Sequence, residues 1–328
     1  MDANTETTSI PQYETTVFTL KPDNFGPNRA TLLHARTTKK SNLYKAVLYL
    51  HGYNDYFFQD HVCNRFLDFG YDFFALDMHK CGRSIISPEQ DQYRHYCTDM
   101  HEYDEEISLS IEHMNKQAEE YANKKFALIG HSTVGGLTAC LYALSGPKHS
   151  DIDALILNSP NLVELDKSAI QSAFVSILIA TNSSKDIIAG WNGRSLHVSH
   201  KGEWNFDTTK KPIDKVRIHG AFFAACRRAQ LEIAQNGTSI KCPILFMSSN
   251  RSMKCDTIWR DEYAEVDLVL NVENIRRAAG MLGQHVTLCP IEKATHDVFL
   301  SKKPVREQAF KCMFQWLENL EREWIKDV

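Results

Sequence analysis

A glycine-rich turn in the middle of the chain holds the residue best suited to nucleophilic chemistry. An apolar run at residues 125–129 leads into Gly-His-Ser at 130–132, and residues 137–144 have good helix propensity. A strand that enters a helix through Gly-x-Ser is the setting of a nucleophile elbow, where a sharp turn lifts the serine hydroxyl out of the sheet. We therefore predict Ser132 as a nucleophile and the backbone N–H of Thr133 as an oxyanion donor. The alternative is a surface serine in an ordinary loop.

Val134 is the departure from the usual elbow sequence. The elbow needs a small residue two places after the serine, where the helix passes close to its strand, but the glycines follow only at Gly135 and Gly136, as though one residue had been inserted. Val134 is β-branched and restricted at χ1. Two interpretations follow: either the turn is reshaped, or the elbow is not the standard one.

A serine hydroxyl needs a base, and the base needs an acid that orients it. In hydrolases with an elbow, the chain order is serine, acid, histidine. His296 lies in a loop just beyond an apolar strand at residues 286–288, where it would hang over the carboxyl edge of the sheet. His285 precedes that strand and should lie at the opposite edge. We predict His296 as the base.

Several carboxylates lie in the right part of the chain to be the acid. Asp267 has the best setting, because it follows an apolar strand at 244–247 and comes just before a predicted helix starting near Val272. Asp256 is the second choice, and Asp261 and Glu262 also qualify by order. For any one of them the alternative is a solvated surface carboxylate, which most such groups are.

A second oxyanion donor should come from the loop after the first buried strand. The apolar strand at residues 46–50 runs directly into His51-Gly52-Tyr53, where Gly52 allows a tight turn and the N–H of Tyr53 is available. Loss of one oxyanion donor typically lowers the rate by about a hundredfold or more. We therefore predict the Tyr53 N–H as the second donor.

The elements that must position these residues alternate between strand and helix. Continuous apolar segments of four or five residues recur between helical patterns, which is typical of strands buried on both faces of a parallel sheet. The predicted fold is α/β, a mostly parallel, doubly wound sheet. The predicted strands lie at residues 15–20, 30–35, 46–50, 73–76, 125–129, 154–157, 244–247 and 286–288.

The alternation stops between residues 161 and 241. This stretch contains the most apolar helix candidate, at residues 168–180, and a second one at 219–234. We predict a helical cap or lid without a sheet of its own, inserted between core segments 1–160 and 242–328. An apolar lid favours apolar substrates; the alternative is that its apolar face only packs on the core.

Composition is typical of a soluble globular protein, with 43% hydrophobic and 24% charged residues among 328. The net charge of −4 and the lack of a long basic run argue against a nucleic-acid partner. The nine cysteines are odd in number and form no C-x-x-C motif. Residues 1–14 do not resemble a signal peptide, and no apolar run is long enough to span a membrane. We expect a reduced, cytoplasmic protein and leave its oligomeric state open.

Taken in order, these motifs resemble the α/β-hydrolase superfamily, and within it the monoglyceride lipase and serine aminopeptidase-like branch. The matching pieces are Leu50-His51-Gly52, Leu76-Asp77 with Gly82-Arg83-Ser84, Gly130-His131-Ser132, and the loops of Asp267 and His296. The resemblance implies the same nucleophile, acid and base, and places the backbone amides of Tyr53 and Thr133 at the oxyanion. It also implies a cap where residues 161–241 lie.

We therefore expect a serine hydrolase that cleaves carboxylic esters of apolar acyl groups through an acyl-enzyme. Monoacylglycerol and lysophospholipid are the first candidate substrates, and no metal or organic cofactor is expected. A lactone hydrolase or acyltransferase would use the same triad. A non-catalytic ligand-binding or scaffold protein on a hydrolase fold is the alternative from another class, suggested by Val134. The apolar insertion would allow transient contact with a membrane surface.

Overall fold

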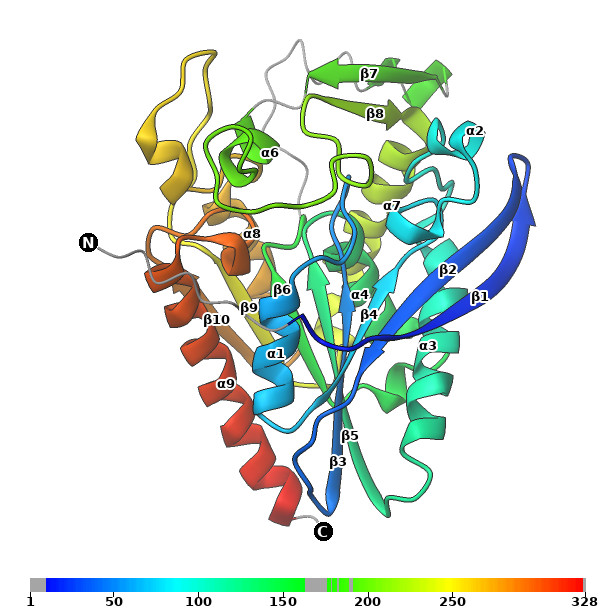
Figure 1. Ribbon diagram of the computed structural model, residues 1–328, viewed down its shortest axis with the longest axis vertical. Helices are drawn as coiled ribbons and strands as arrows, with labels where there is room; N and C mark the ends of the chain where they lie inside the picture. The colour runs from blue at the N-terminus through cyan, green and yellow to red at the C-terminus, as the bar shows by residue number, and fades with distance from the viewer. Residues whose placement is uncertain (1–9, 163–175, 178, 182, 189–190, 327–328) are drawn as a thin grey trace.

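Eight strands form one mixed sheet in the computed structural model, which describes residues 10–162, 176–177, 179–181, 183–188 and 191–326 (Figure 1). Their order across the sheet is β1-β2-β4-β3-β5-β6-β9-β10. The first two strands form an antiparallel hairpin and β2 pairs antiparallel to β4, while all other pairs are parallel. The strands span β1 (Glu14–Asp23), β2 (Gly26–Ala35), β3 (Leu43–Leu50), β4 (Asp72–Asp77), β5 (Asn123–His131), β6 (Ala154–Asn158), β9 (Ile244–Ser249) and β10 (Val286–Ile291).

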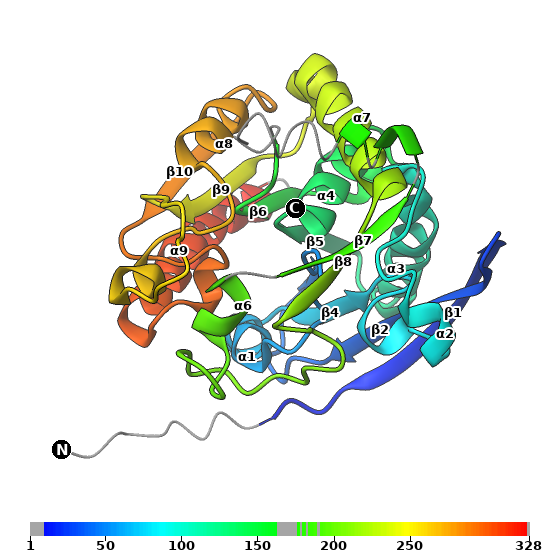
Figure 2. The ribbon, with the colours of Figure 1, turned by 90° about the horizontal axis from the view of Figure 1, so that it is seen from above.

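The central strands are apolar along their length because both of their faces are covered. Strands β4, β6 and β9 are buried at every residue, as expected for parallel strands between two helical layers. Figure 2 shows helices on both faces of the sheet. The helices of the core are α1 (Asp60–Asp68), α2 (Pro88–Asp91), α3 (Asp104–Gln117), α4 (Val134–Ser145), α8 (Val272–Ala279) and α9 (Lys303–Lys326).

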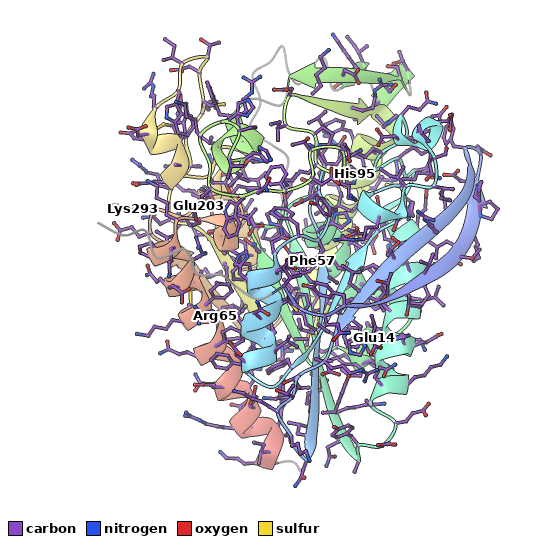
Figure 3. All side chains as sticks on the ribbon, in the orientation of Figure 1. Glu14, Phe57, Arg65, His95, Glu203 and Lys293 are labelled. Carbon is purple, nitrogen blue, oxygen red and sulfur yellow. A yellow bond between two sulfur atoms is a disulfide. The ribbon has the colours of Figure 1, made fainter. Side chains whose placement is uncertain are left out.

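Two apolar clusters, one on each face of the sheet, make up most of the core. Helices α1 and α9 cover one face, and α9 contributes the apolar stripe that includes Phe310 and Trp324. Helices α3, α4 and α8 cover the other. In Figure 3, Phe57 lies inside the molecule, whereas Lys293 lies at its rim. The connections contain 3-10 turns η1 (Gly82–Ser84), η2 (Met100–Tyr103), η3 (His149–Asp151), η4 (Gly237–Ser239), η5 (Asp261–Glu265) and η6 (Val298–Leu300).

The insertion between β6 and β9 lies above the carboxyl ends of the central strands (Figure 1). Its described elements are β7 (Ser184–Ile188), α6 (Trp191–Leu196), β8 (Lys215–His219) and α7 (Gly220–Asn236). The second predicted helix corresponds to α7, but most of the apolar helix predicted at residues 168–180 lies outside the described residues. The prediction that the insertion has no sheet is wrong, because β7 and β8 pair antiparallel and Asp186 and Arg217 form an ion pair across them.

The cysteines differ in one respect from the sequence prediction of a reduced chain. Cys289 on β10 and Cys312 on α9 form a disulfide, because α9 packs against β10 and brings residues 23 apart in sequence together. The other seven cysteines are not disulfide-bonded. Among the described helices, none combines the length and apolar composition that a membrane span requires.

Candidate active site

Ser132 occupies a strained turn at the carboxyl end of β5. Its φ of +56° lies in the left-handed region, which is uncommon for a residue other than glycine and is found at functional turns. The Ser132 N–H donates to the carbonyl of Asn158 at 3.0 Å, and α4 begins two residues later at Val134. The side chain is only 6% exposed, so Ser132 is not a surface serine.

The first turn of α4 shows why Val134 is tolerated. The close approach to the sheet falls at Gly135, whose N–H donates to the His51 carbonyl at 2.9 Å. A Cβ at Gly135 would lie 2.6 Å from the His51 carbonyl oxygen and closer still to that of Leu50. Val134 instead points into the core and is fully buried. The glycine is therefore required three places after Ser132, and the position two places after it has room for a branched side chain.

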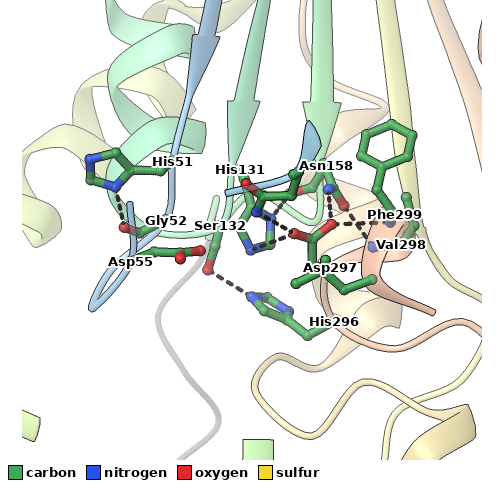
Figure 4. Close-up of polar contacts among 12 residues, drawn as sticks. His51, Gly52, Asp55, His131, Ser132, Asn158, His296, Asp297, Val298 and Phe299 are labelled. Atoms are coloured by element: carbon green, nitrogen blue, oxygen red, sulfur yellow. Dashed lines mark hydrogen bonds and ion pairs between the residues drawn. The ribbon is translucent and has the colours of Figure 1, made fainter. Parts of the chain in front are cut away.

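The three predicted residues Ser132, His296 and Asp267 lie in one chain of hydrogen bonds. Ser132 Oγ is 2.7 Å from His296 Nε2 (Figure 4), and His296 Nδ1 is 2.8 Å from Asp267 Oδ2. Because a carboxylate oxygen only accepts, Nδ1 carries the proton and Nε2 can accept the serine proton. All three side chains are buried, at 6%, 4% and 0% exposure.

Asp267 is held rigidly by its own backbone surroundings. Its Oδ1 accepts the N–H groups of Val269 and Leu270 at 2.7 and 2.9 Å, which leaves Oδ2 for the histidine. The Asn271 side chain then caps the start of α8 through the N–H groups of Glu273 and Asn274.

The other residues considered for these roles lie elsewhere. Asp256 is exposed and forms an ion pair with Arg260, and Asp261 and Glu262 are exposed in η5. The carbonyl of His285 accepts the N–H of Ile244 at the start of β9, at the edge of the sheet opposite His296.

The loop after β3 lies directly against the nucleophile. A Cβ added at Gly52 would come within 3.1 Å of the Ser132 Cβ and 2.8 Å of the His131 ring. The predicted oxyanion donor, the Tyr53 N–H, therefore belongs to a loop in contact with the elbow, and the other predicted donor, the N–H of Thr133, belongs to the elbow itself. The absence of a side chain at Gly52 is what allows this approach.

The same loop is joined to the insertion above it. The Tyr53 hydroxyl donates to the Arg217 carbonyl, and the Tyr53 ring stacks on Phe222 with centroids 4.8 Å apart. Asn54 Nδ2 donates to the carbonyl of Pro212 at 2.7 Å. The predicted oxyanion loop is therefore in direct contact with the insertion.

His95 supports this loop from below, and no pattern in the sequence indicates this role. The Asn54 N–H donates to His95 Nε2 at 2.6 Å, and His95 Nδ1 lies 3.1 Å from Cys81 Sγ. His95 is 1% exposed and lies in the interior below β8 (Figure 3). Burial, with a smaller electrostatic contribution from His51 and Arg94, lowers the pKa of His95 well below its ordinary value, so the ring is a neutral acceptor.

Comparisons with known proteins agree with the predicted fold. The family model described as serine aminopeptidase, S33, matches residues 41–302. No curated protein matches the chain in sequence.

Several solved structures share the fold over nearly the whole chain. A soluble variant of monoglyceride lipase from Saccharomyces cerevisiae, in complex with a substrate analogue, has 14% identity and a TM-score of 0.68, covering 95% of this chain and 96% of its own. The monoacylglycerol lipase of Paleococcus ferrophilus has 18% identity and a TM-score of 0.61, covering 93% and 98%. A thermostable carboxyl esterase from Bacillus coagulans, in complex with glycerol, has 12% identity and a TM-score of 0.63, covering 93% and 98%.

Proposed function

The chain belongs to the serine aminopeptidase, S33, family of α/β hydrolases, and from this premise we propose that it hydrolyses carboxylic esters of apolar acyl groups through a serine acyl-enzyme. The observation that carries the proposal is the continuous hydrogen-bonded chain from Ser132 Oγ through His296 to Asp267, with distances of 2.7 and 2.8 Å. A nucleophile, a base and an orienting acid at these distances are the parts that acyl transfer needs.

Each residue has a defined part in the proposed reaction. Ser132 Oγ attacks the ester carbonyl while His296 Nε2 takes its proton, and the N–H groups of Tyr53 and Thr133 stabilise the oxyanion. His296 then gives the proton to the departing alcohol, leaving an acyl group on Ser132. A water molecule, deprotonated by His296, releases the acid. Asp267 keeps the imidazole in the required tautomer and stabilises the imidazolium.

The proposed substrate class is monoacylglycerol or lysophospholipid. Two of the structural relatives are monoacylglycerol lipases, and the esterase relative was solved with glycerol bound. The insertion at residues 161–241 is proposed as the cap over the site, since its residues Pro212, Arg217 and Phe222 contact the predicted oxyanion loop. Transient contact of the cap with a membrane surface and a cytoplasmic location stay predictions.

A fluorophosphonate probe tests the proposal, because it reacts only with a serine activated by its base. We expect wild-type protein to be labelled and Ser132→Ala not to be. Asp267→Asn should lower kcat for an aryl ester by about 10⁴-fold through loss of the correct tautomer. Asp256→Asn is the matched control and should leave kcat unchanged. Folded wild-type protein that resists the probe would instead support a non-catalytic binding or scaffold protein.

A screen over monoacylglycerols, lysophospholipids, aryl esters and lactones then separates the remaining alternatives. Preference for acylglycerols or lysolipids supports the proposed substrate class. Preference for a lactone, or transfer of the acyl group to an added alcohol in place of water, identifies the lactonase or acyltransferase alternative on the same triad.

A further inference from the structure

A buried polar cluster outside the proposed triad lies beside Ser132 and His296 (Figure 4). At its centre is Asn158, the last residue of β6, which is fully buried. The Asn158 carbonyl accepts the backbone N–H of Ser132 at 3.0 Å and Nδ1–H of His131 at 3.0 Å. The backbone of Asn158 therefore fixes the nucleophile elbow to the neighbouring strand.

The side chain of Asn158 holds the loop that carries the base. Its Nδ2 donates to Asp297 Oδ1 at 2.7 Å, and its Oδ1 accepts the N–H of Val298 at 3.2 Å. Asp297 directly follows His296, and its Oδ1 also accepts the N–H of Phe299 at 3.0 Å, which closes the turn. One residue thus contacts the elbow through its backbone and the base loop through its side chain.

The Asp297 carboxylate depends on these donors. It is 3% exposed, and burial alone would raise its pKa, but the electrostatic interaction with His131 and the hydrogen bonds from Asn158 and Phe299 hold the pKa below its ordinary value. The other nearby polar atoms are more distant, with Gln59 Nε2 at 3.5 Å and His131 Nε2 at 3.9 Å. Without Asn158, a buried charge would lose its shortest hydrogen bond, which is costly.

We propose that Asn158 and Asp297 are positioning residues whose hydrogen bonds set the distance between Ser132 Oγ and His296 Nε2. Asp267 orients the imidazole ring, whereas the Asn158–Asp297 pair fixes where its loop sits relative to the elbow. The proposal rests on the proposed serine hydrolase function. A misplacement of about 1 Å between reacting groups can cost about a hundredfold in rate, so loss of the pair should act on kcat.

The test first removes the side-chain hydrogen bonds of Asn158 and then exchanges the amide and the carboxylate between positions 158 and 297. Asn158→Leu, of similar volume, removes both side-chain hydrogen bonds, and we expect kcat for an aryl ester to fall about a hundredfold with KM within threefold of wild type. The double variant N158D/D297N keeps a carboxamide–carboxylate pair with the partners reversed and should restore kcat to within about tenfold of wild type. Asn115→Leu, which breaks the Asn115–Asp151 hydrogen bond between α3 and η3, is the matched control and should leave kcat unchanged.

Melting temperatures of all variants separate positioning from folding. If Asn158→Leu does not fold, the exchanged double variant still decides: near-wild-type kcat supports the proposal, and activity lost in a folded double variant overturns it. Asn158→Leu with kcat within threefold of wild type also overturns it, as does a loss confined to KM. If wild-type protein does not react with the fluorophosphonate, the proposed function is wrong, and so is the positioning role that rests on it.

Discussion

At the residue scale, the neutral ring of His95 is the acceptor on which the predicted oxyanion loop depends. Loss of its partner costs a buried backbone N–H about 1–3 kcal/mol, and here the N–H is that of Asn54, which is half-buried and next to Tyr53. His95→Leu should therefore lower kcat by roughly 10- to 100-fold, less than direct loss of an oxyanion donor, with a small effect on KM. His95→Gln, which offers an acceptor again, should recover part of the rate.

A transition-state analogue makes the His95 experiment specific to the oxyanion. His95 has a φ of +57°, a conformation that costs free energy for leucine and glutamine alike. His95→Leu and His95→Gln are therefore compared with each other as well as with wild type. The affinity for a trifluoromethyl ketone should fall with kcat in His95→Leu and recover in His95→Gln. Equal rates in wild type and His95→Leu would contradict a supporting role for this ring.

The residues of the proposed triad could be named from the sequence because chain order and strand ends are visible there. Ser132, Asp267 and His296 each follow a strand of the parallel sheet, so all three had to reach the same edge. His95 could not be found in this way, and although Asn158 ends β6 at the same edge, chain order gives no sign of its role. Their importance comes from buried hydrogen bonds to backbone groups of distant segments, and such contacts leave no spacing pattern in the chain.

At the element scale, the contact between α4 and β3 requires glycine at position 135. A Cβ there would meet the His51 carbonyl oxygen at 2.6 Å, which forces the helix away from the strand. Gly135→Ala should lower the free energy of unfolding by about 3 kcal/mol, at the upper end for overpacking, and abolish fluorophosphonate labelling. Gly280→Ala, whose added Cβ has its nearest neighbour at 3.5 Å, is the control and should change stability little in urea denaturation.

Val134 is part of the packing of α4, and we expect it not to impair the elbow. Because its side chain is fully buried in the core, Val134→Gly should lower the free energy of unfolding by about 2 kcal/mol or more, from lost burial and reduced helix propensity. The rate of fluorophosphonate labelling per folded molecule should stay within about threefold of wild type. A large gain in labelling rate would mean that the valine impairs the elbow after all.

The core elements could be predicted from sequence far better than the insertion. Strands such as β3 and β9 contain continuous apolar runs, and α9 has a clear apolar stripe, so pattern alone identifies them. Strands β7 and β8 are short and half polar, and among the described residues they pair with each other alone, across 26 intervening residues. Their pairing depends on the shape of the cap, which no local pattern records.

At the scale of the whole molecule, burial keeps several histidines neutral in the folded state. Burial lowers the pKa of His61 to about 4, and it also lowers the pKa values of His95, His113, His131 and His219. The unfolded chain binds protons at these residues near pH 6.5, before the folded chain does. Their contribution to stability is therefore complete above about pH 7 and is lost progressively as the pH falls below 6.5.

Chemical denaturation at pH 8 and pH 5.5 measures this loss. Each histidine that stays neutral in the folded state should lower the free energy of unfolding at pH 5.5, relative to pH 8, by about 1.4 kcal/mol. The total from several histidines is a large share of the roughly 5–15 kcal/mol that is typical of a domain. His61→Gln should reduce the difference in free energy of unfolding between pH 8 and pH 5.5 by about 1.4 kcal/mol.

His101→Gln should instead increase the difference in free energy of unfolding between pH 8 and pH 5.5. Although burial opposes it, hydrogen bonds to Asp104 and Glu232 raise the pKa of His101, so the folded chain gains from its protonation. A free energy of unfolding that is equal at both pH values would show that these buried rings take up protons in the folded state as readily as in the unfolded one.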